Sequence, residues 1–178
     1  MTPRTICRSC SANRRTSKQN AYSRAAQKFQ FNRLLRLVDE TAAQRGANDA
    51  VFAQTGFSDY EPKHYTKQAF LQKEEFEQQI RDCDLLVTHG GVSTIITALK
   101  YSKKIVVIPR LGKYGEHVDD HQMQIAESFE QQGLVLCYRE NDDLSALIEK
   151  AMRFDFTPYV SHRADMVSTI ERYLAELK

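Results

Sequence analysis

Two glycines and two hydroxyl residues follow an apolar run in the stretch VTHGGVSTIITALK, residues 87–100. Glycine removes the side chain where a strand turns sharply into a helix, and the first N–H groups of a helix have no partner within that helix. Such N–H groups attract anions, and Ser93 and Thr94 add hydroxyl donors beside them. The turn at Gly90 and Gly91 therefore predicts a diphosphate site, although the same pattern also suits an ordinary capped helix.

A second polar cluster lies in the stretch PRLGKYGEHVDDHQ, residues 109–122, which follows the next apolar run. His117 and His121 are four residues apart, so on one helical face they and Asp120 could ligate a metal. Two other interpretations stay open. The stretch could be a polar helix start in which acidic residues favour the helix dipole, or a hydroxyl-binding edge in which His121 and Gln122 contact a sugar.

Helical and strand patterns alternate along most of the chain. We expect helices over 31–46, 74–82, 92–102, 118–132, 142–152 and 162–177, and strands over 50–57, 64–71, 84–89, 104–109 and 134–139. Continuous apolar runs such as 84–89 are typical of strands buried on both faces of a parallel sheet. The order predicts an α/β fold, a Rossmann-like open parallel sheet with helices on both faces. Both polar stretches then lie at the carboxyl ends of strands, where such folds bind ligands.

The composition is that of one globular domain. The chain has 178 residues, of which 42% are hydrophobic and 27% charged, and no apolar run reaches the length of a membrane span or signal peptide. We expect a reduced, cytoplasmic protein in which Cys83 and Cys137 are buried, because both lie in apolar segments. Cys7 and Cys10 form a single CxxC, whereas structural zinc needs four ligands.

The beginning of the chain differs from the rest. Residues 1–38 contain Lys and Arg but no Asp or Glu, and no apolar periodic face precedes Phe29. We therefore expect residues 1–26 to form a basic, disordered segment. A transit peptide or a nucleic-acid-binding arm would share this composition, but we expect no nucleic-acid partner.

Together the two polar stretches resemble a known family. A strand, THGG, a helix, a strand ending in Pro109 and then DHQ resemble the donor-binding C-terminal half of B-type glycosyltransferases, in glycosyltransferase family 28. The stretches GFSDYEP, THGG, IPR and GEHVDDHQ are most similar to the small subunits of bacterial exopolysaccharide galactosyltransferases. The catalytic subunit of the eukaryotic dolichol-linked N-acetylglucosaminyltransferase is also similar. The resemblance runs from about Gln27 to the C-terminus and implies a UDP-sugar-binding domain over residues 27–178.

The resemblance also implies where UDP-sugar binds. It places the diphosphate on the glycine turn, the uracil at the backbone of Phe70 and Leu71, and the sugar hydroxyls at His121 and Gln122. Thr97 stands where many relatives have a glutamate that binds ribose, and its neutral hydroxyl makes a weaker contact. The full expected set, whose last two members have no assigned role, is His89, Gly90, Gly91, Ser93, Thr94, Phe70, Leu71, Thr97, His121, Gln122, Glu116 and His117.

The implied activity is that of a hexosyltransferase (EC 2.4.1 type) that moves galactose or N-acetylglucosamine from UDP-sugar to a lipid-linked acceptor. We find no convincing general base, so the catalytic residues stay unassigned. No metal or cofactor is expected, because helix N–H groups can stabilise the departing UDP. The resemblance implies a membrane-associated acceptor-binding partner that recruits this chain to the cytoplasmic face of the membrane. The apolar stripe of 162–177 could dock that partner or pack on its own sheet.

Three other functions were weighed. A noncatalytic UDP-sugar-binding protein and a metal-dependent hydrolase using His89, His117 and His121 stay open as alternatives. A UDP-sugar epimerase is disfavoured, because such enzymes are normally longer chains with two domains.

One feature departs from the family pattern. Relatives begin with a strand and a glycine loop directly before the segment equivalent to QKFQFNRLL, residues 27–35. Here NAYSRAA, residues 20–26, has neither a β-branched run nor a glycine. We therefore expect the sheet to lack its first strand or to fill it poorly. An altered reading frame or a mistaken start before Gln27 would produce such a change, so the hypothesis that residues 1–26 are aberrant stands beside the expectation that they are disordered.

Overall fold

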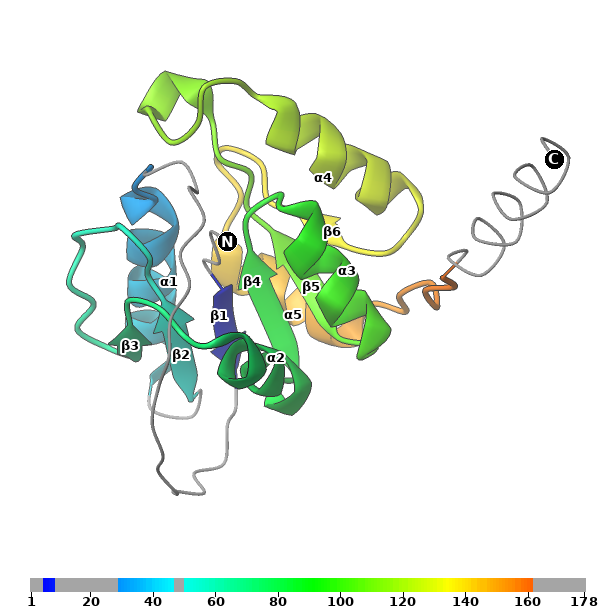
Figure 1. Ribbon diagram of the computed structural model, residues 1–178, viewed down its shortest axis with the longest axis horizontal. Coiled ribbons are helices and arrows are strands. Elements are labelled where there is room, and N and C mark those ends of the chain that lie inside the picture. Colours follow the sequence, from blue (N-terminus) through cyan, green and yellow to red (C-terminus); the bar gives the residue numbers. More distant parts are fainter. Residues whose placement is uncertain (1–4, 9–28, 47–49, 162–178) are drawn as a thin grey trace, which may run out of the picture.

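The structure, a computed structural model, describes residues 5–8, 29–46 and 50–161 (Figure 1). In these residues six strands form one sheet in the order β3-β2-β1-β4-β5-β6. The strands are β1 (Thr5–Arg8), β2 (Val51–Gln54), β3 (Thr66–Gln68), β4 (Leu85–Thr88), β5 (Lys104–Val107) and β6 (Leu136–Cys137). The helices are α1 (Asn32–Arg45), α2 (Lys73–Asp82), α3 (Val92–Lys100), the 3-10 helix η2 (Gly112–Tyr114), α4 (His121–Gln131) and α5 (Leu144–Arg153).

Every strand except β1 runs in the same direction. β2 pairs with β3, β4 with β5 and β5 with β6 in parallel ladders, whereas β1 is antiparallel to both β2 and β4. The strand order is that of doubly wound nucleotide-binding sheets. The predicted fold class, a Rossmann-like open sheet with covering helices, is confirmed, with β1 as the one reversed strand.

Strand β1 lies in the segment that we expected to have no regular structure. Thr5–Arg8 fills the position of the first strand, where Ile6 is paired with Ala53 on one side and Val87 on the other. Without it, β2 and β4 would expose unpaired N–H and C=O groups in the middle of the sheet. We expected a sheet that lacks its first strand or fills it poorly; in the structure a strand of four residues occupies that position in the reverse direction.

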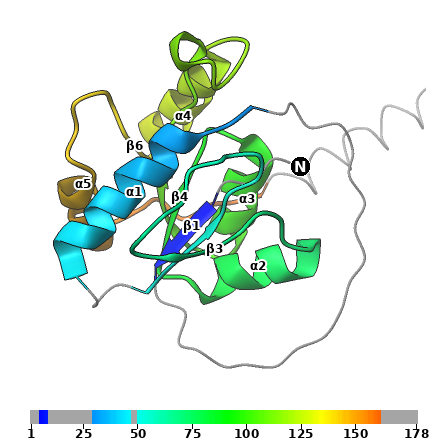
Figure 2. The ribbon, with the colours of Figure 1, turned by 90° about the vertical axis from the view of Figure 1, so that its left-hand side faces the viewer.

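The helices cover both faces of the sheet (Figure 2). Leu85 and Val87 of β4 pack in one core with α1 and α5, whereas Leu86 packs in a second core with α2, α3 and α4. This alternation confirms that the apolar run of β4 is buried on both faces. In the described ranges no helix is long and apolar enough to cross a membrane.

Two cysteines lie in the second core. Cys83 and Cys137 are both buried there, as the sequence predicted. Burial raises the pKa of the Cys137 thiol to about 12, so this sulfur stays protonated at neutral pH. The predicted helix over 162–177, and with it the partner-docking interpretation, lies outside the described residues, as does Cys10.

The stretch GFSDYEP, residues 56–62, holds the start of α1. Ser58 Oγ accepts a hydrogen bond from the Phe31 N–H at 2.9 Å, which satisfies one of the N–H groups left open at a helix start. Asn32 Nδ2 donates to Asp59 Oδ1 at 2.5 Å. This part of the family-like pattern therefore positions α1.

A buried carboxylate, Asp39, fastens the loop that follows this stretch. Its oxygens accept hydrogen bonds from the N–H groups of Lys63 (3.0 Å) and His64 (2.8 Å) and from the Tyr60 hydroxyl (2.9 Å). Burial alone raises the pKa of Asp39, but the hydrogen bonds from Lys63, His64 and Tyr60 outweigh it, so the pKa lies below its ordinary value. The charged form is thus favoured by folding.

We expect Asp39→Asn to lower the free energy of unfolding at neutral pH by about 1–3 kcal/mol, the usual range for hydrogen bonds to a charged group. Because the folded pKa is depressed, the carboxylate stabilises fully above its unfolded pKa of about 3.9 and loses that effect as the pH falls through the folded pKa. Urea denaturation of both proteins should therefore show a difference at pH 7 that shrinks below about pH 4. The exposed Asp155→Asn is the control, and a difference that is independent of pH would contradict this account.

Candidate functional site

The glycine turn, residues 89–91, joins β4 to α3 at the carboxyl edge of the sheet. Neither Gly90 nor Gly91 has a positive φ, so conformational freedom is not the reason for glycine here. A Cβ on Gly90 would lie 2.6 Å from the backbone oxygen of Gln122, and one on Gly91 would lie 2.2 Å from Cε1 of His89. The turn requires glycine because α4 and the buried imidazole pack directly against it.

Helix α3 begins without a side-chain cap. Its N-cap residue is Gly91, whose carbonyl oxygen accepts from the N–H groups of Thr94 and Ile95 at 3.1 Å each. Within the described residues the N–H groups of Val92 and Ser93 make no hydrogen bond. Both residues are exposed, and their N–H groups lie at the positive end of the helix dipole. Two unbonded donors at a helix start are compatible with the predicted anion site.

Gln122, in the first turn of α4, connects the glycine turn to the end of β5. Its Oε1 atom accepts hydrogen bonds from the N–H groups of Gly90 (3.2 Å) and Arg110 (3.3 Å). Two N–H donors face this atom, which identifies it as the oxygen and leaves the amide NH₂ as the donor group for a ligand. The predicted sugar-binding residue thus also holds two strand ends together.

Thr97 and His121 are engaged within their own helices. The Thr97 hydroxyl donates to the carbonyl oxygen of Ser93 at 2.8 Å, so it can offer a ribose only its acceptor function. The exposed His121 ring lies beside Gln124, with Nδ1 at 3.2 Å from Oε1. Both residues lie on helices that begin at the same edge of the sheet as the glycine turn.

Phe70 and Leu71 follow β3 at this edge. The Leu71 N–H donates to Oε1 of the buried Gln54 at 3.1 Å, so this backbone donor is already occupied. The Phe70 ring is 46% exposed and contacts Phe57 edge to face, with 5.2 Å between ring centroids. Three strand spacings, about 14 Å, separate β3 from β4. One ligand that reached both Phe70 and the glycine turn would therefore have to be extended.

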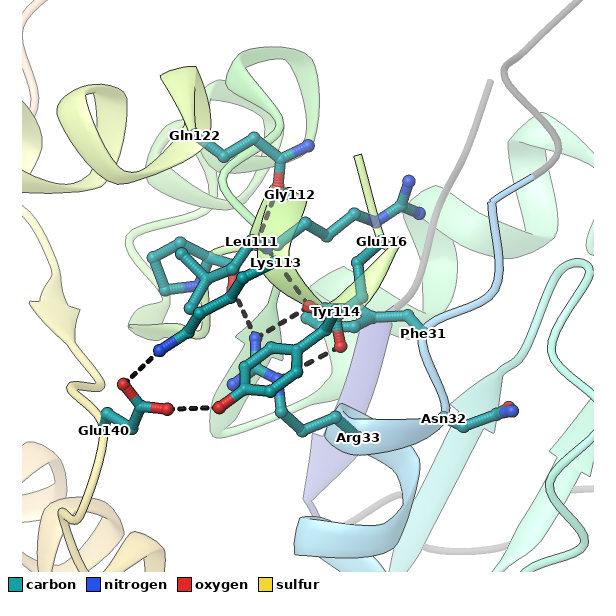
Figure 3. Close-up of polar contacts among 12 residues, drawn as sticks. Phe31, Asn32, Arg33, Leu111, Gly112, Lys113, Tyr114, Glu116, Gln122 and Glu140 are labelled. Atoms are coloured by element: carbon teal, nitrogen blue, oxygen red, sulfur yellow. Dashed lines mark hydrogen bonds and ion pairs between the residues drawn. The ribbon is translucent and has the colours of Figure 1, made fainter. Parts of the chain in front are cut away.

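Glu116 fastens the loop after β5 to α1 (Figure 3). The carboxylate is 1% exposed and accepts from Arg33 Nε at 3.1 Å, from Arg33 Nη2 at 2.9 Å and from the Leu111 N–H at 3.1 Å. Arg33 Nη2 also donates to the Pro109 carbonyl oxygen at 2.7 Å. Glu116, which the sequence left without a role, is thus part of a buried ion pair that positions the loop.

The outer part of the same loop is held at a second place. Lys113 Nζ and the Tyr114 hydroxyl both bond to the carboxylate of Glu140, in the connection between β6 and α5 (Figure 3). These bonds lower the pKa of Glu140. The loop is therefore fixed at both sides, which keeps the start of α4 beside the glycine turn.

The structure does not place His117 and His121 on one helical face. Helix α4 begins at His121, later than the predicted start at 118, because Asp119 Oδ1 and the His117 ring bond in the preceding loop at 2.9 Å. In the described ranges no group of three His, Cys, Asp or Glu side chains could hold a metal. The geometric premise of the metal interpretation is therefore wrong. His117 and Asp119 do form a histidine–carboxylate pair, which the sequence reasoning had not found.

The sequence reasoning also missed Arg110, which directly follows Pro109 at the end of β5. Its side chain is 1% exposed, and its guanidinium carbon lies 5.5 Å from the centroid of the Phe31 ring. A charged residue immediately after a buried apolar strand was the available signal.

A groove of about 370 Å³ lies along the solvent side of α1 and does not include the glycine turn. It is lined by Gln30, Asn32, Arg33, Arg36, Leu37, Glu40, Tyr114 and Glu116. We place the candidate site at the glycine turn instead, because open backbone donors and the amide of Gln122 converge there.

The family follows from a comparison of the sequence with family models. The model of the glycosyltransferase family 28 C-terminal domain matches residues 26–171, which include the glycine turn, the loop after β5 and α4. The chain belongs to this family. A comparison with curated proteins finds no match. The family 28 domain described here is thus a glycosyltransferase donor-binding domain, as the resemblance had implied.

Proposed function

We propose that this family 28 domain binds a UDP-sugar at the glycine turn and is the donor-binding subunit of a hexosyltransferase. The transferred sugar is galactose or N-acetylglucosamine, and the acceptor is a lipid-linked sugar in polysaccharide or glycan synthesis. The observation that carries the proposal is the open start of α3, where the N–H groups of Val92 and Ser93 make no hydrogen bond within the described residues and the adjoining Gly90 is bonded to the amide of Gln122. Membership of the family supports it.

Each contact has a chemical task in this proposal. The N–H groups of α3 and the Ser93 hydroxyl stabilise the negative charge that develops on UDP as the sugar leaves. The NH₂ group of Gln122 donates to a sugar hydroxyl, while its oxygen stays bonded to the backbone of Gly90 and Arg110. The exposed Phe70 ring offers an apolar face for uracil.

We expect UDP to bind without a divalent metal, because helix N–H groups supply the positive charge that a metal would otherwise provide. Calorimetry in excess chelator measures this directly. In the same titration Val92→Pro should weaken UDP binding by about tenfold, the loss of one charge-assisted hydrogen bond. Proline is tolerated at the first position of a helix, and Gly91 already has the extended backbone that must precede it.

The matched control is Lys73→Pro, at the first position of α2, where Gln72 is also extended. It removes an N–H group from a helix that does not begin at the glycine turn, so UDP affinity should be unchanged. Binding that appears only after magnesium or manganese is added would refute the metal-free site. If the wild type and Val92→Pro bound UDP with equal affinity, the start of α3 would not be part of the UDP site.

We expect the chain alone to transfer no sugar and to become active with a membrane-associated partner that binds the acceptor. One domain of this size forms one wall of a two-domain cleft. The assay is transfer of labelled sugar from UDP-sugar into lipid, with and without membranes that contain the partner, and with Val92→Pro as a variant of reduced donor affinity. Transfer by the purified chain alone would contradict partner dependence. UDP-sugar binding with no transfer in any mixture would favour the noncatalytic alternative.

A further inference from the structure

Arg110 carries a buried charge at the edge of the sheet where the glycine turn lies. Its backbone N–H donates to Gln122 Oε1, the atom that also accepts the Gly90 N–H, so one side chain links Arg110 to the turn. The guanidinium extends in the direction of α1, where it lies against the Phe31 ring. The backbone of Arg110 is thus linked to the turn before α3, whereas its side chain lies at the start of α1.

Two nitrogen atoms of this guanidinium have no hydrogen-bond acceptor in the described part of the chain. Both Nε and Nη2 of Arg110 are buried and make no hydrogen bond. Buried polar groups are nearly always hydrogen-bonded, and a buried charge without a partner is strongly unfavourable. Burial lowers the pKa of Arg110 to about 10, so the group still carries its charge at neutral pH.

Glu116 does not supply the missing acceptor. It is the carboxylate that acts on Arg110 electrostatically, but its oxygens accept from Arg33 and from the Leu111 N–H. The negative charge of Glu116 is therefore engaged mainly by Arg33. Arg110 carries its positive charge without an anion hydrogen-bonded to it. The remaining positive charge suits an anion from outside the chain.

The position of Arg110 in the sheet indicates which kind of anion it would bind. In the order β3-β2-β1-β4-β5-β6 the chain reverses its direction of winding between β1 and β4, and ligands of such sheets bind above that point. Helices α1 and α3 follow the two halves of the sheet, and Arg110 extends from β5 to the start of α1. The planar guanidinium fork matches a phosphate group better than a single charge does.

We propose that Arg110 binds phosphate oxygens of the donor nucleotide and so adds a side-chain cation to the diphosphate site at the start of α3. The inference rests on the proposed function, since it assumes a nucleotide at the glycine turn. Because the side chain is 1% exposed, binding requires the groups that cover the guanidinium to move. A purely structural role, in which the cation only packs against Phe31, makes a different prediction.

The test compares uridine, UDP and inorganic pyrophosphate in calorimetry with the wild type, Arg110→Met and Arg110→Lys. We expect Arg110→Met to weaken UDP and pyrophosphate binding by about 10- to 100-fold, as for other charge-assisted contacts, and to leave uridine binding unchanged. The affinity of Arg110→Lys for UDP and pyrophosphate should lie between those of the wild type and Arg110→Met. The exposed Lys100→Met, which removes one positive charge at the far end of α3, should have no effect. Unchanged UDP affinity in Arg110→Met, or an equal loss for uridine, would overturn the inference.

A second measurement needs no variant to fold. The buried Nε–H of Arg110 gives an NMR signal that can be assigned through its bonds, and it should shift when UDP or pyrophosphate is added but not with uridine. An Nε–H signal that is unaffected by pyrophosphate and UDP would overturn the inference even if UDP binds. A wild-type chain that binds neither UDP nor uridine would refute the proposed function instead, and the pyrophosphate titration would then decide the role of Arg110 separately.

Discussion

Replacing Gly90 by alanine is expected to lower the free energy of unfolding by about 2–3 kcal/mol, in the range for overpacked buried positions. The added Cβ would lie 2.6 Å from the backbone oxygen of Gln122 and 2.8 Å from its Cβ. A backbone atom at the start of α4 cannot turn away as a flexible side chain can. The helix must shift, and the shared acceptor of Gly90 and Arg110 moves with it.

Gly112→Ala is the matched control, because its new Cβ would have 3.5 Å to the nearest atom, an Asp120 carboxylate oxygen. Urea denaturation should show little change for Gly112→Ala and a clear loss for Gly90→Ala. UDP affinity should fall in Gly90→Ala even under conditions where the protein is fully folded. Equal stability of the two variants would show that the contact between the glycine turn and α4 is loose.

Replacing Arg33 by methionine is expected to cost about 3 kcal/mol of stability, because it leaves the Glu116 carboxylate buried without its cation. The pair is bonded through two nitrogen atoms of Arg33 and two oxygen atoms of Glu116. The double variant Arg33→Met/Glu116→Gln should recover part of the loss, since it removes the buried charge. Denaturation of the two single variants and the double variant measures the coupling energy.

The surface pair of Arg45 and Glu149 provides the comparison. Glu149 is 57% exposed and the two charged atoms are 3.4 Å apart, so Arg45→Met should cost at most about 1 kcal/mol. If Arg33→Met lowered the free energy of unfolding no more than Arg45→Met does, the loop after β5 would not depend on the pair of Arg33 and Glu116. In that case the position of α4 beside the glycine turn would need another cause.

The strands with continuous apolar runs were predictable from the sequence, because a strand that is buried on both faces of a sheet has apolar residues at nearly every position. Leu85–Thr88 and Lys104–Val107 both lie within their predicted ranges. Strand β1 was not predicted, because Arg and polar residues surround its β-branched pair and both of its partners are distant in the sequence. The predicted start of α4 was wrong, since the Asp119 carboxylate bonds to the His117 ring and accepts from the His121 N–H in the loop before the helix.

The site was predictable in part. The glycine turn was identified from its residue types, but the reason for glycine, contact with Gln122 and His89, depends on how α4 packs. Glu116 and Arg33 are far apart in the sequence, so no local pattern could pair them. Arg110 was read as part of a loop, because burial of a charged group follows only from the position of α1. Long-range packing, rather than local propensity, decides these roles.

The reversed direction of β1 also bears on the order in which the sheet assembles. The parallel pair β4·β5 is joined through α3, and β5·β6 through η2 and α4, so both pairs join strands that are consecutive in the chain and can form early with a smaller loss of chain entropy. Both ladders of β1 instead join residues dozens of positions apart, at Ala53 and Val87. Such non-local pairings form slowly. We therefore expect β2 and β3 on one side, and β4 to β6 on the other, to assemble as separate parallel blocks that β1 joins late in folding.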